Sequence, residues 1–332
     1  MICPGARADY LWGAMSPTPQ HHRAFQVSAV WTLGLLFLGS VVHATGSSLA
    51  CPDWPTCYGS MLPAMEGGVF WEHLHRLVAG GLILMWGLAW WLARREGASW
   101  RVQVGCALGF ALLVVQAVVG GVTVLLRLSA AVSTTHLVLA LLFLALVVTL
   151  AVESSPRRGE AEAFAPGLRR ALRRWGHAAA ATVLVQSVAG GLVRHMEGGL
   201  ACPDVPLCLG EVVPPFVHPL VALHFAHRVL GVITAVVVLA ATGAILRAGA
   251  RGAVARLAAV VSALVVAQIG LGIWSVAGRL AVAPVSLHTL VAALLFAAAI
   301  ALAGWGRVTP TPQPPETAAS AAAVGALHRS TW

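Results

Sequence analysis

Long apolar segments, separated by short polar connections, run through almost the whole chain. A hydrocarbon core of about 30 Å requires about 20 apolar residues for one crossing helix. Eight segments reach that length, and we expect helices at residues 25–43, 74–93, 103–126, 131–152, 175–194, 224–246, 254–276 and 284–305. The pattern therefore predicts an all-α integral membrane protein with eight transmembrane helices.

A repeat divides these segments into two groups of four. The motif LACPDWPTC at residues 49–57 returns as LACPDVPLC at residues 200–208, and later positions match at a displacement of 152 residues. The matched pairs are His75 and His227, Gln116 and Gln268, Gly120 and Gly272, and His136 and His288. An even number of helices separates equivalent positions, so both groups have the same orientation in the membrane. We therefore expect two four-helix bundles related as a parallel repeat.

The repeat and its connections define the regions of the chain. We expect a cytoplasmic N-terminal extension at 1–24, an N-terminal bundle at 25–152, a cytoplasmic linker at 153–174, a C-terminal bundle at 175–305 and a disordered cytoplasmic tail at 306–332. The tail is rich in Pro, Ala and Thr without a periodic apolar face, which is typical of disorder. The extension has no continuous apolar run after Arg7 and so does not resemble a cleaved signal peptide, and translation could start at Met1 or Met15.

The arginines indicate how the chain is oriented. All 21 basic residues are Arg, and sixteen of them fall on one side of the predicted membrane. The other five are Arg76, Arg127, Arg194, Arg228 and Arg279. Because connections rich in basic residues stay in the cytoplasm, we expect both termini there and the two repeated motifs outside. For a bacterial protein this orientation corresponds to the cytoplasmic (inner) membrane.

Composition agrees with a membrane protein and excludes other classes. Of the 332 residues, 58% are hydrophobic and 10% are charged, whereas a soluble domain has about 25% charged residues. The net charge of +9 would suit a nucleic-acid partner, but no polar domain is long enough to present such a surface. We expect membrane lipid as a partner and no nucleic acid.

Four histidines occupy equivalent positions of the repeat: His75, His136, His227 and His288. Each lies in the first turns of an even-numbered helix, so all four imidazoles are expected at a similar depth near the outer face. Two imidazoles that face each other inside a four-helix bundle can bind a heme iron from both sides. The alternatives are interfacial histidines bonded to carbonyl groups, or a non-heme iron or zinc site, for which neither half supplies a third ligand. Polar groups within a membrane are costly and usually functional, which favours heme ligands over interfacial histidines.

Arg76 and Arg228 each directly follow one of these histidines. Guanidinium groups bind carboxylates well, so heme propionates are candidate partners. The alternative is an arginine whose head group reaches lipid phosphate.

Two cysteine pairs lie in the outer connections, Cys51 with Cys57 and Cys202 with Cys208. The outer compartment of bacteria is oxidising, and the short, proline-containing spacing allows a small ring, so we expect two disulfides, each within its own loop. The spacing differs from the CxxCH motif of covalent heme attachment. A zinc site shared by all four cysteines is the alternative.

The repeat breaks one turn before the first histidine of each half, where Glu72 corresponds to His224. A spacing of three residues puts Glu72 on the same helix face as His75. Only the N-terminal half therefore places a carboxylate beside its proposed heme position, where it could transfer protons or stabilise positive charge. The alternatives are an exposed interfacial Glu or one paired with Arg76.

Together these residues resemble the heme A synthase family, the eight-helix membrane enzymes of cytochrome oxidase maturation. The resemblance covers about residues 25–305 and includes both CPDxPxC loops. It rests on Glu72-x-x-His75-Arg76, His136, His227-Arg228 and His288. It implies an oxidoreductase that converts the C8 methyl group of heme O into the formyl group of heme A.

The resemblance also implies a role for each half. The N-terminal half would hold the substrate heme between His75 and His136, with Glu72 as the catalytic carboxylate. The C-terminal half would hold heme B as a prosthetic group. Its axial ligands would be His227 and His288. Cys51 and Cys57 match the functionally important outer pair of the family.

The expected partners are the substrate heme O, an electron acceptor or donor of unknown identity, and heme O synthase, the upstream farnesylating enzyme, as a candidate for a complex. The alternative function is a di-heme b-type cytochrome for quinol-linked electron transfer. Such a cytochrome would keep two unchanged hemes and would not need Glu72.

Overall fold

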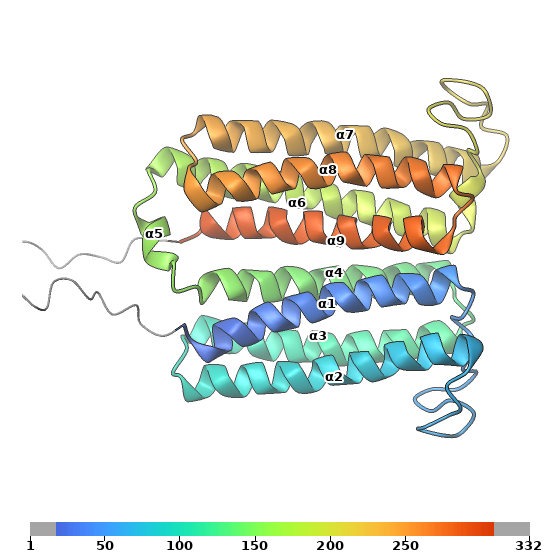
Figure 1. Cartoon of the computed structure of the whole chain (residues 1–332), viewed down its shortest axis with the longest axis horizontal. Coiled ribbons are helices and arrows are strands. Elements are labelled where there is room, and N and C mark those ends of the chain that lie inside the picture. Colours follow the sequence, from blue (N-terminus) through green and yellow to red (C-terminus); the bar gives the residue numbers. More distant parts are fainter. Residues whose placement is uncertain (1–17, 309–332) are drawn as a thin grey trace, which may run out of the picture.

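The computed structural model describes residues 18–308, which fold into helices joined by short connections (Figure 1). Eight of the helices are long and apolar enough to cross a membrane, as predicted. The helices are α1 (Gln20–Ala44), α2 (Gly67–Arg95), α3 (Trp100–Leu125), α4 (Ala130–Glu153), α5 (Arg158–Glu162), α6 (Pro166–His195), η1 (Gly198–Leu200), α7 (Pro219–Arg247), α8 (Gly252–Ala277) and α9 (Val282–Trp305). Residues 1–17 of the expected extension and 309–332 of the expected tail lie outside the described residues.

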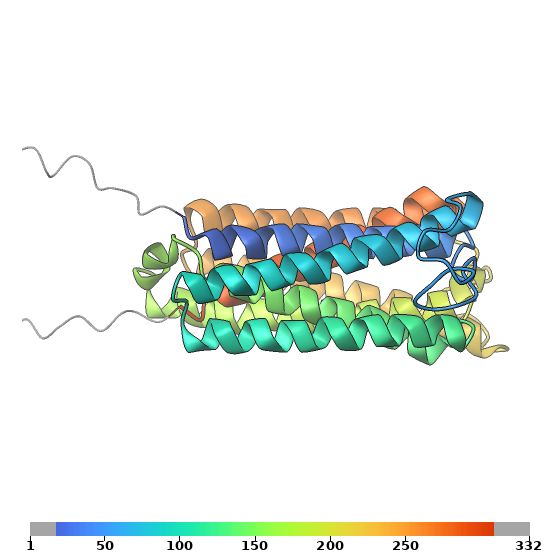
Figure 2. The same ribbon diagram turned by 90° about the horizontal axis from the view of Figure 1, so that it is seen from below.

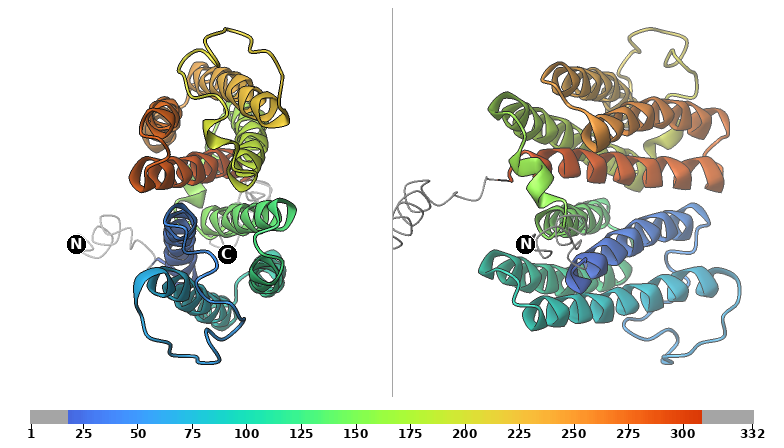
Figure 3. Two further views of the ribbon diagram at one scale, coloured as in Figure 1. Left: turned by 90° about the vertical axis from the view of Figure 1, so that its right-hand side faces the viewer. Right: turned by 60° about the vertical axis from the view of Figure 1, so that its left-hand side comes forward.

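The long helices form two four-helix bundles that lie side by side (Figures 1 and 3). In the first bundle, α1 to α4 contact one another in chain order and α4 closes the circuit against α1. Helices α6 to α9 make the same circuit in the second bundle. The bundles meet where α4 packs against both α6 and α9 and where α1 packs against α9. The parallel orientation of the repeat stays a prediction.

The two ends of the molecule differ in structure. Both disulfide loops lie at one end, whereas α5 and both ends of the described chain lie at the other (Figures 1 and 2). This arrangement follows from the even number of long helices. The functional candidates near the first turns of α2, α4, α7 and α9 are therefore all at the end that carries the disulfides.

Several helices extend beyond the apolar segments that predicted them. Helix α6 begins at Pro166, within the range expected as a linker, and α2 begins at Gly67 rather than near residue 74. For α6, proline at the first helical position has a backbone angle suited to a helix start. For both helices, hydropathy identifies only the apolar part of the helix and not the polar turns that precede it. As a result Glu72, which precedes the predicted apolar segment, lies inside α2.

Glycines let large side chains fill the core of the first bundle. Trp86 is fully buried, and its indole Nε1 donates a hydrogen bond to the carbonyl of Cys106 at 2.9 Å. A Cβ atom at Gly109 would lie 2.4 Å from the Trp86 ring, so the indole requires glycine at this position. Cys106 itself is a buried free cysteine, which agrees with a packing role.

Candidate functional site

The two predicted disulfides form, each within its own outer loop. Cys51 bonds to Cys57 and Cys202 bonds to Cys208, with Cα–Cα distances of 4.8 and 4.7 Å. The alternative of a zinc site shared by the four cysteines is therefore wrong. Across residues 18–308 no group of three or more His, Cys, Asp or Glu side chains is placed to hold a metal ion.

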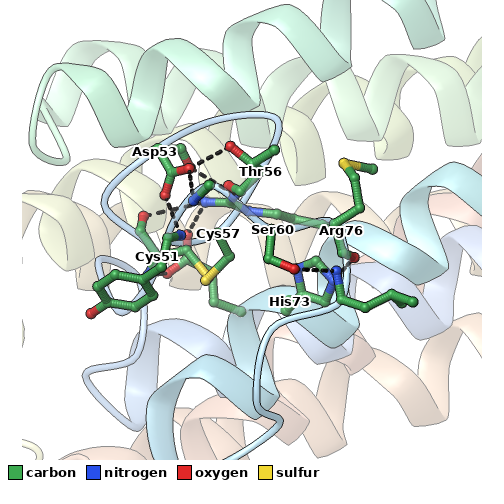
Figure 4. The surroundings of a disulfide bond; sticks show 12 residues. Cys51, Asp53, Thr56, Cys57, Ser60, His73 and Arg76 are labelled. Atoms are coloured by element: carbon green, nitrogen blue, oxygen red, sulfur yellow. Dashed lines mark hydrogen bonds and ion pairs between the residues drawn. A yellow bond between two sulfur atoms is a disulfide. The ribbon is translucent and has the colours of Figure 1, made fainter.

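Asp53 organises the turn inside the first disulfide loop (Figure 4). Its carboxylate accepts hydrogen bonds from the Thr56 hydroxyl and from the backbone N–H groups of Tyr58, at 2.6 Å, and Gly59, at 2.9 Å. The Thr56 hydroxyl, followed by the Gly59 N–H, lowers the pKa of Asp53 to about 2. The charged carboxylate thus holds the turn through hydrogen bonds from two backbone N–H groups. In the second loop, Asp204 accepts from the N–H of Gly210 at 2.5 Å.

Arg76 and Arg228 bind the disulfide loops through backbone carbonyls. Arg76 Nη1 donates to the carbonyls of Asp53, at 2.8 Å, and Thr56, at 2.6 Å. Arg228 Nη1 donates to the equivalent carbonyls of Asp204 and Leu207, both at 2.8 Å. Both guanidinium groups therefore anchor a loop to the helix beneath it, and their role as propionate ligands stays a prediction.

Glu72 lies directly beneath the first disulfide loop. It is 5% exposed, and its Oε2 accepts a hydrogen bond from the N–H of Cys51 at 2.8 Å. Its Oε1 accepts from Arg76 Nη2 at 2.5 Å. Glu72 is thus buried and paired with Arg76, rather than an exposed interfacial residue. Its Oε2 therefore connects α2 to the loop, and its Oε1 binds an arginine of the same helix.

His224 occupies the same place in the second bundle but makes weaker contacts. Its Nδ1 lies 3.4 Å from the N–H of Cys202 and 3.0 Å from the carbonyl of Gly198. A neutral imidazole nitrogen either accepts from the first group or donates to the second, whereas a carboxylate oxygen only accepts. The sequence difference between Glu72 and His224 therefore becomes a difference in how each helix contacts the N–H of the first loop cysteine.

The four repeated histidines are divided equally between the two bundles. His75 lies on α2 and His136 on α4, while His227 lies on α7 and His288 on α9. Each ring packs against a glycine on a neighbouring helix. An added Cβ would lie 2.9 to 3.2 Å from a ring atom at each of these glycines, which are Gly39, Gly120, Gly190 and Gly272.

Glutamines accompany three of the four histidines. Gln116 Nε2 lies 3.4 Å from His136 Nε2, Gln186 Nε2 lies 3.1 Å from His227 Nδ1, and Gln268 Nε2 lies 3.2 Å from His288 Nε2. Each glutamine precedes by four residues the glycine that faces the same ring. The corresponding position before Gly39, opposite His75, is Leu35. The first bundle therefore differs from the second in two positions. It has the Glu72 carboxylate in place of His224 and Leu35 in place of the Gln186 amide.

His73 and His195 have no counterpart in the repeat, which suggested loop histidines, but they lie in α2 and α6 and make specific contacts. His73 is 2% exposed, and its Nε2 lies 3.0 Å from the carbonyl of Met61 at the end of the first loop (Figure 4). His195 ends α6, and its Nδ1 lies 3.0 Å from the Thr134 hydroxyl of the other bundle. Its ring also packs edge-on against His43, with centroids 5.5 Å apart. Neither histidine belongs to a repeated pair, so the repeat gave no signal for them.

Comparison with known proteins identifies relatives over most of the chain. A family model described as cytochrome oxidase assembly protein, COX15-CtaA, matches residues 23–300. The heme A synthase of Symbiobacterium thermophilum is 32% identical over 273 residues, which cover 79% of this chain and 87% of that protein. The heme A synthase of Alkalihalophilus pseudofirmus is 29% identical over 292 residues, which cover 84% and 95% of the two chains.

Proposed function

Because the chain belongs to the COX15-CtaA family of cytochrome oxidase assembly proteins, we propose that it is a heme A synthase. Such an oxidoreductase converts the C8 methyl group of heme O into the formyl group of heme A. The observation that carries the proposal is the buried carboxylate of Glu72, one turn from His75 in the first bundle, where the second bundle has His224. The relatives found by comparison do not favour a di-heme electron-transfer cytochrome.

The first bundle, residues 25–152, is the substrate half in this proposal. His75 and His136 flank heme O, and Glu72 lies on the same helix as His75. Leu35 leaves the His75 ring without the amide neighbour that the other three histidines have. A less engaged imidazole suits a site that must accept and release its occupant.

The second bundle, residues 175–305, holds heme B through His227 and His288. The side chains there fit such a group: two imidazoles are available as iron ligands, and a glycine faces each ring. Among the described residues, His288 Nδ1 and the Oε1 atoms of Gln186 and Gln268 are buried without hydrogen-bond partners. A bound heme B supplies one-electron oxidation and reduction at its iron.

Glu72 is the catalytic carboxylate of the proposal. Both of its oxygens are engaged, one by the Cys51 N–H and one by Arg76. A proton taken up at either oxygen would compete with one of these donors, so the loop and Arg76 control which oxygen is available. General acid–base catalysis by a positioned carboxylate typically contributes about 100-fold to 10,000-fold in rate.

The chain is a multi-pass membrane protein, and in this proposal it lies in the bacterial cytoplasmic membrane with both termini in the cytoplasm. The uneven distribution of arginines and the location of both described chain ends at one end of the molecule support that orientation. The partners are heme O, membrane lipid, heme O synthase as the source of the substrate, and an electron partner that is not identified.

Analysis of extracted heme tests this function. The full-length chain is produced together with a heme O synthase in cells that lack their own heme A synthase, and the hemes are separated by mass. We expect heme A to appear only when the chain is present. Cells that contain only heme O and heme B, despite normal amounts of the protein in the membrane, would overturn the assignment.

A further inference from the structure

Arg194 is a partly buried arginine at the contact between the two bundles. It lies near the end of α6, and its Nη2 donates to the carbonyl of Ser40 on α1 at 2.7 Å. Its Nη1 donates to the Ser40 hydroxyl at 2.8 Å and lies 3.4 Å from the Thr289 hydroxyl on α9. All of these partners are neutral.

No described side chain neutralises this cation. The ion pairs among the described side chains join His21 to Glu96 and Arg76 to Glu72, and neither involves Arg194. The Arg194 Nε is buried and has no hydrogen-bond partner within the described residues. A charged group within a membrane-spanning segment is costly and usually functional, so an effect of the charge on a neighbouring group is expected.

The neighbouring group is His288, one of the two histidines proposed to bind heme in the second bundle. Thr289, which Arg194 contacts, directly follows His288 in α9. Arg228, the other arginine in this region, directly follows His227 and donates its hydrogen bonds to loop carbonyls.

We propose that Arg194 raises the reduction potential of the heme held by His227 and His288. Reduction adds one negative charge to the heme, and a fixed positive charge in a low-dielectric region stabilises that state over the oxidised one. Arg194 thus acts on the heme through its positive charge and does not bind the iron. This inference rests on the proposed binding of heme B in the second bundle.

Optical redox titration of the purified, heme-loaded protein tests the inference. Replacement of Arg194 by Gln removes the charge and is expected to lower the midpoint potential of the bound heme. At a fixed ambient potential the ratio of reduced to oxidised heme should fall roughly tenfold, as for unit charges about 10 Å apart at an effective dielectric constant of about 20. Arg194→Lys keeps the charge and should retain most of the wild-type potential.

Two control variants separate the charge from packing and from general surface effects. Ser40→Ala removes a neutral partner of Arg194 but keeps the cation, so it should leave the potential near the wild-type value. Arg279→Gln removes an exposed charge from the outer connection between α8 and α9 and should also leave it unchanged. If Arg194→Gln fails to fold, the other two variants still test the inference. Both Arg194→Lys and Ser40→Ala keep the positive charge, so a lowered midpoint potential in both would contradict a role for that charge.

The outcomes distinguish this inference from the proposed function. A wild-type protein without b-type heme would contradict the cofactor assignment itself. A heme-loaded Arg194→Gln protein with an unchanged midpoint potential would overturn the role of Arg194 and leave the heme A synthase assignment intact.

Discussion

The carboxylate of Glu72 accepts a hydrogen bond from the backbone N–H of Cys51 at 2.8 Å. This contact joins α2, one turn before His75, to the first cysteine of the outer disulfide loop. Arg76 binds the other carboxylate oxygen and two carbonyls of the same loop. A rearrangement of the loop therefore changes the surroundings of Glu72 directly.

Opening the first disulfide is expected to reduce heme A formation. In a Cys51→Ser and Cys57→Ser double variant the loop is no longer closed, and the Cys51 N–H is free to leave Glu72. A hydrogen bond to a charged group contributes about 1.5–3 kcal/mol, so we expect a loss of roughly tenfold or more in heme A per protein. The matched control is the Cys202→Ser and Cys208→Ser double variant, whose loop contacts His224 instead of a carboxylate. Equal losses in both variants would show that the loops act only on general stability.

Replacement of Glu72 by Gln is expected to abolish most heme A formation, by about 100-fold or more, because the amide cannot exchange a proton. The amide NH₂ would also face either Arg76 or the Cys51 N–H, donor against donor. Heme B content should stay at the wild-type level, and thiol labelling should still find Cys51 and Cys57 protected. Glu66→Gln, an exposed residue just before α2, is the control. Heme A formation at the wild-type rate in Glu72→Gln would remove this carboxylate from the mechanism.

The membrane helices and both disulfides were predictable because their signals are local. A run of apolar residues specifies a crossing helix, and two cysteines in one short loop can meet without information about the rest of the fold. The repeat also predicted that Glu72 and His224 occupy equivalent positions. It did not predict that each would contact the N–H of the first cysteine of its loop, because every residue has a backbone donor and only the fold determines which one is near.

Contacts between the bundles could not be predicted from the sequence. Arg194 and Ser40 are 154 residues apart, and no motif connects them. The sequence placed Arg194 among the few arginines on the outer side. Its position follows from how the end of α6 meets Ser40 of α1 and Thr289 of α9, which hydropathy and repeat matching do not determine.

The order of the first disulfide loop is expected to depend on pH only under strongly acidic conditions. The pKa of Asp53 is lowered from 3.8 to about 2, chiefly by the Thr56 hydroxyl and the Gly59 N–H. A lowered pKa in the folded state means that the contribution of the carboxylate is complete above its unfolded value and is lost as the pH falls toward about 2. Hydrogen-exchange protection of the Tyr58 and Gly59 amides, corrected for intrinsic rates, should be constant between pH 7 and about 5. An Asp53→Asn variant should lose this protection at neutral pH, and wild-type-like protection would contradict the role of the charge.

Leu35 is expected to leave the His75 imidazole free to bind the substrate heme. In a Leu35→Gln variant the new amide would occupy the position equivalent to Gln186, whose Nε2 lies 3.1 Å from His227 Nδ1. An amide that binds His75 in the same way competes with heme O for the imidazole, so heme A formation should fall roughly tenfold, the effect of about one hydrogen bond. Heme B in the second bundle should be retained. Val30→Gln adds the same amide at an exposed position of α1 and measures the cost of a polar group on that helix. A Leu35→Gln protein as active as wild type would show that the missing glutamine is unrelated to substrate binding.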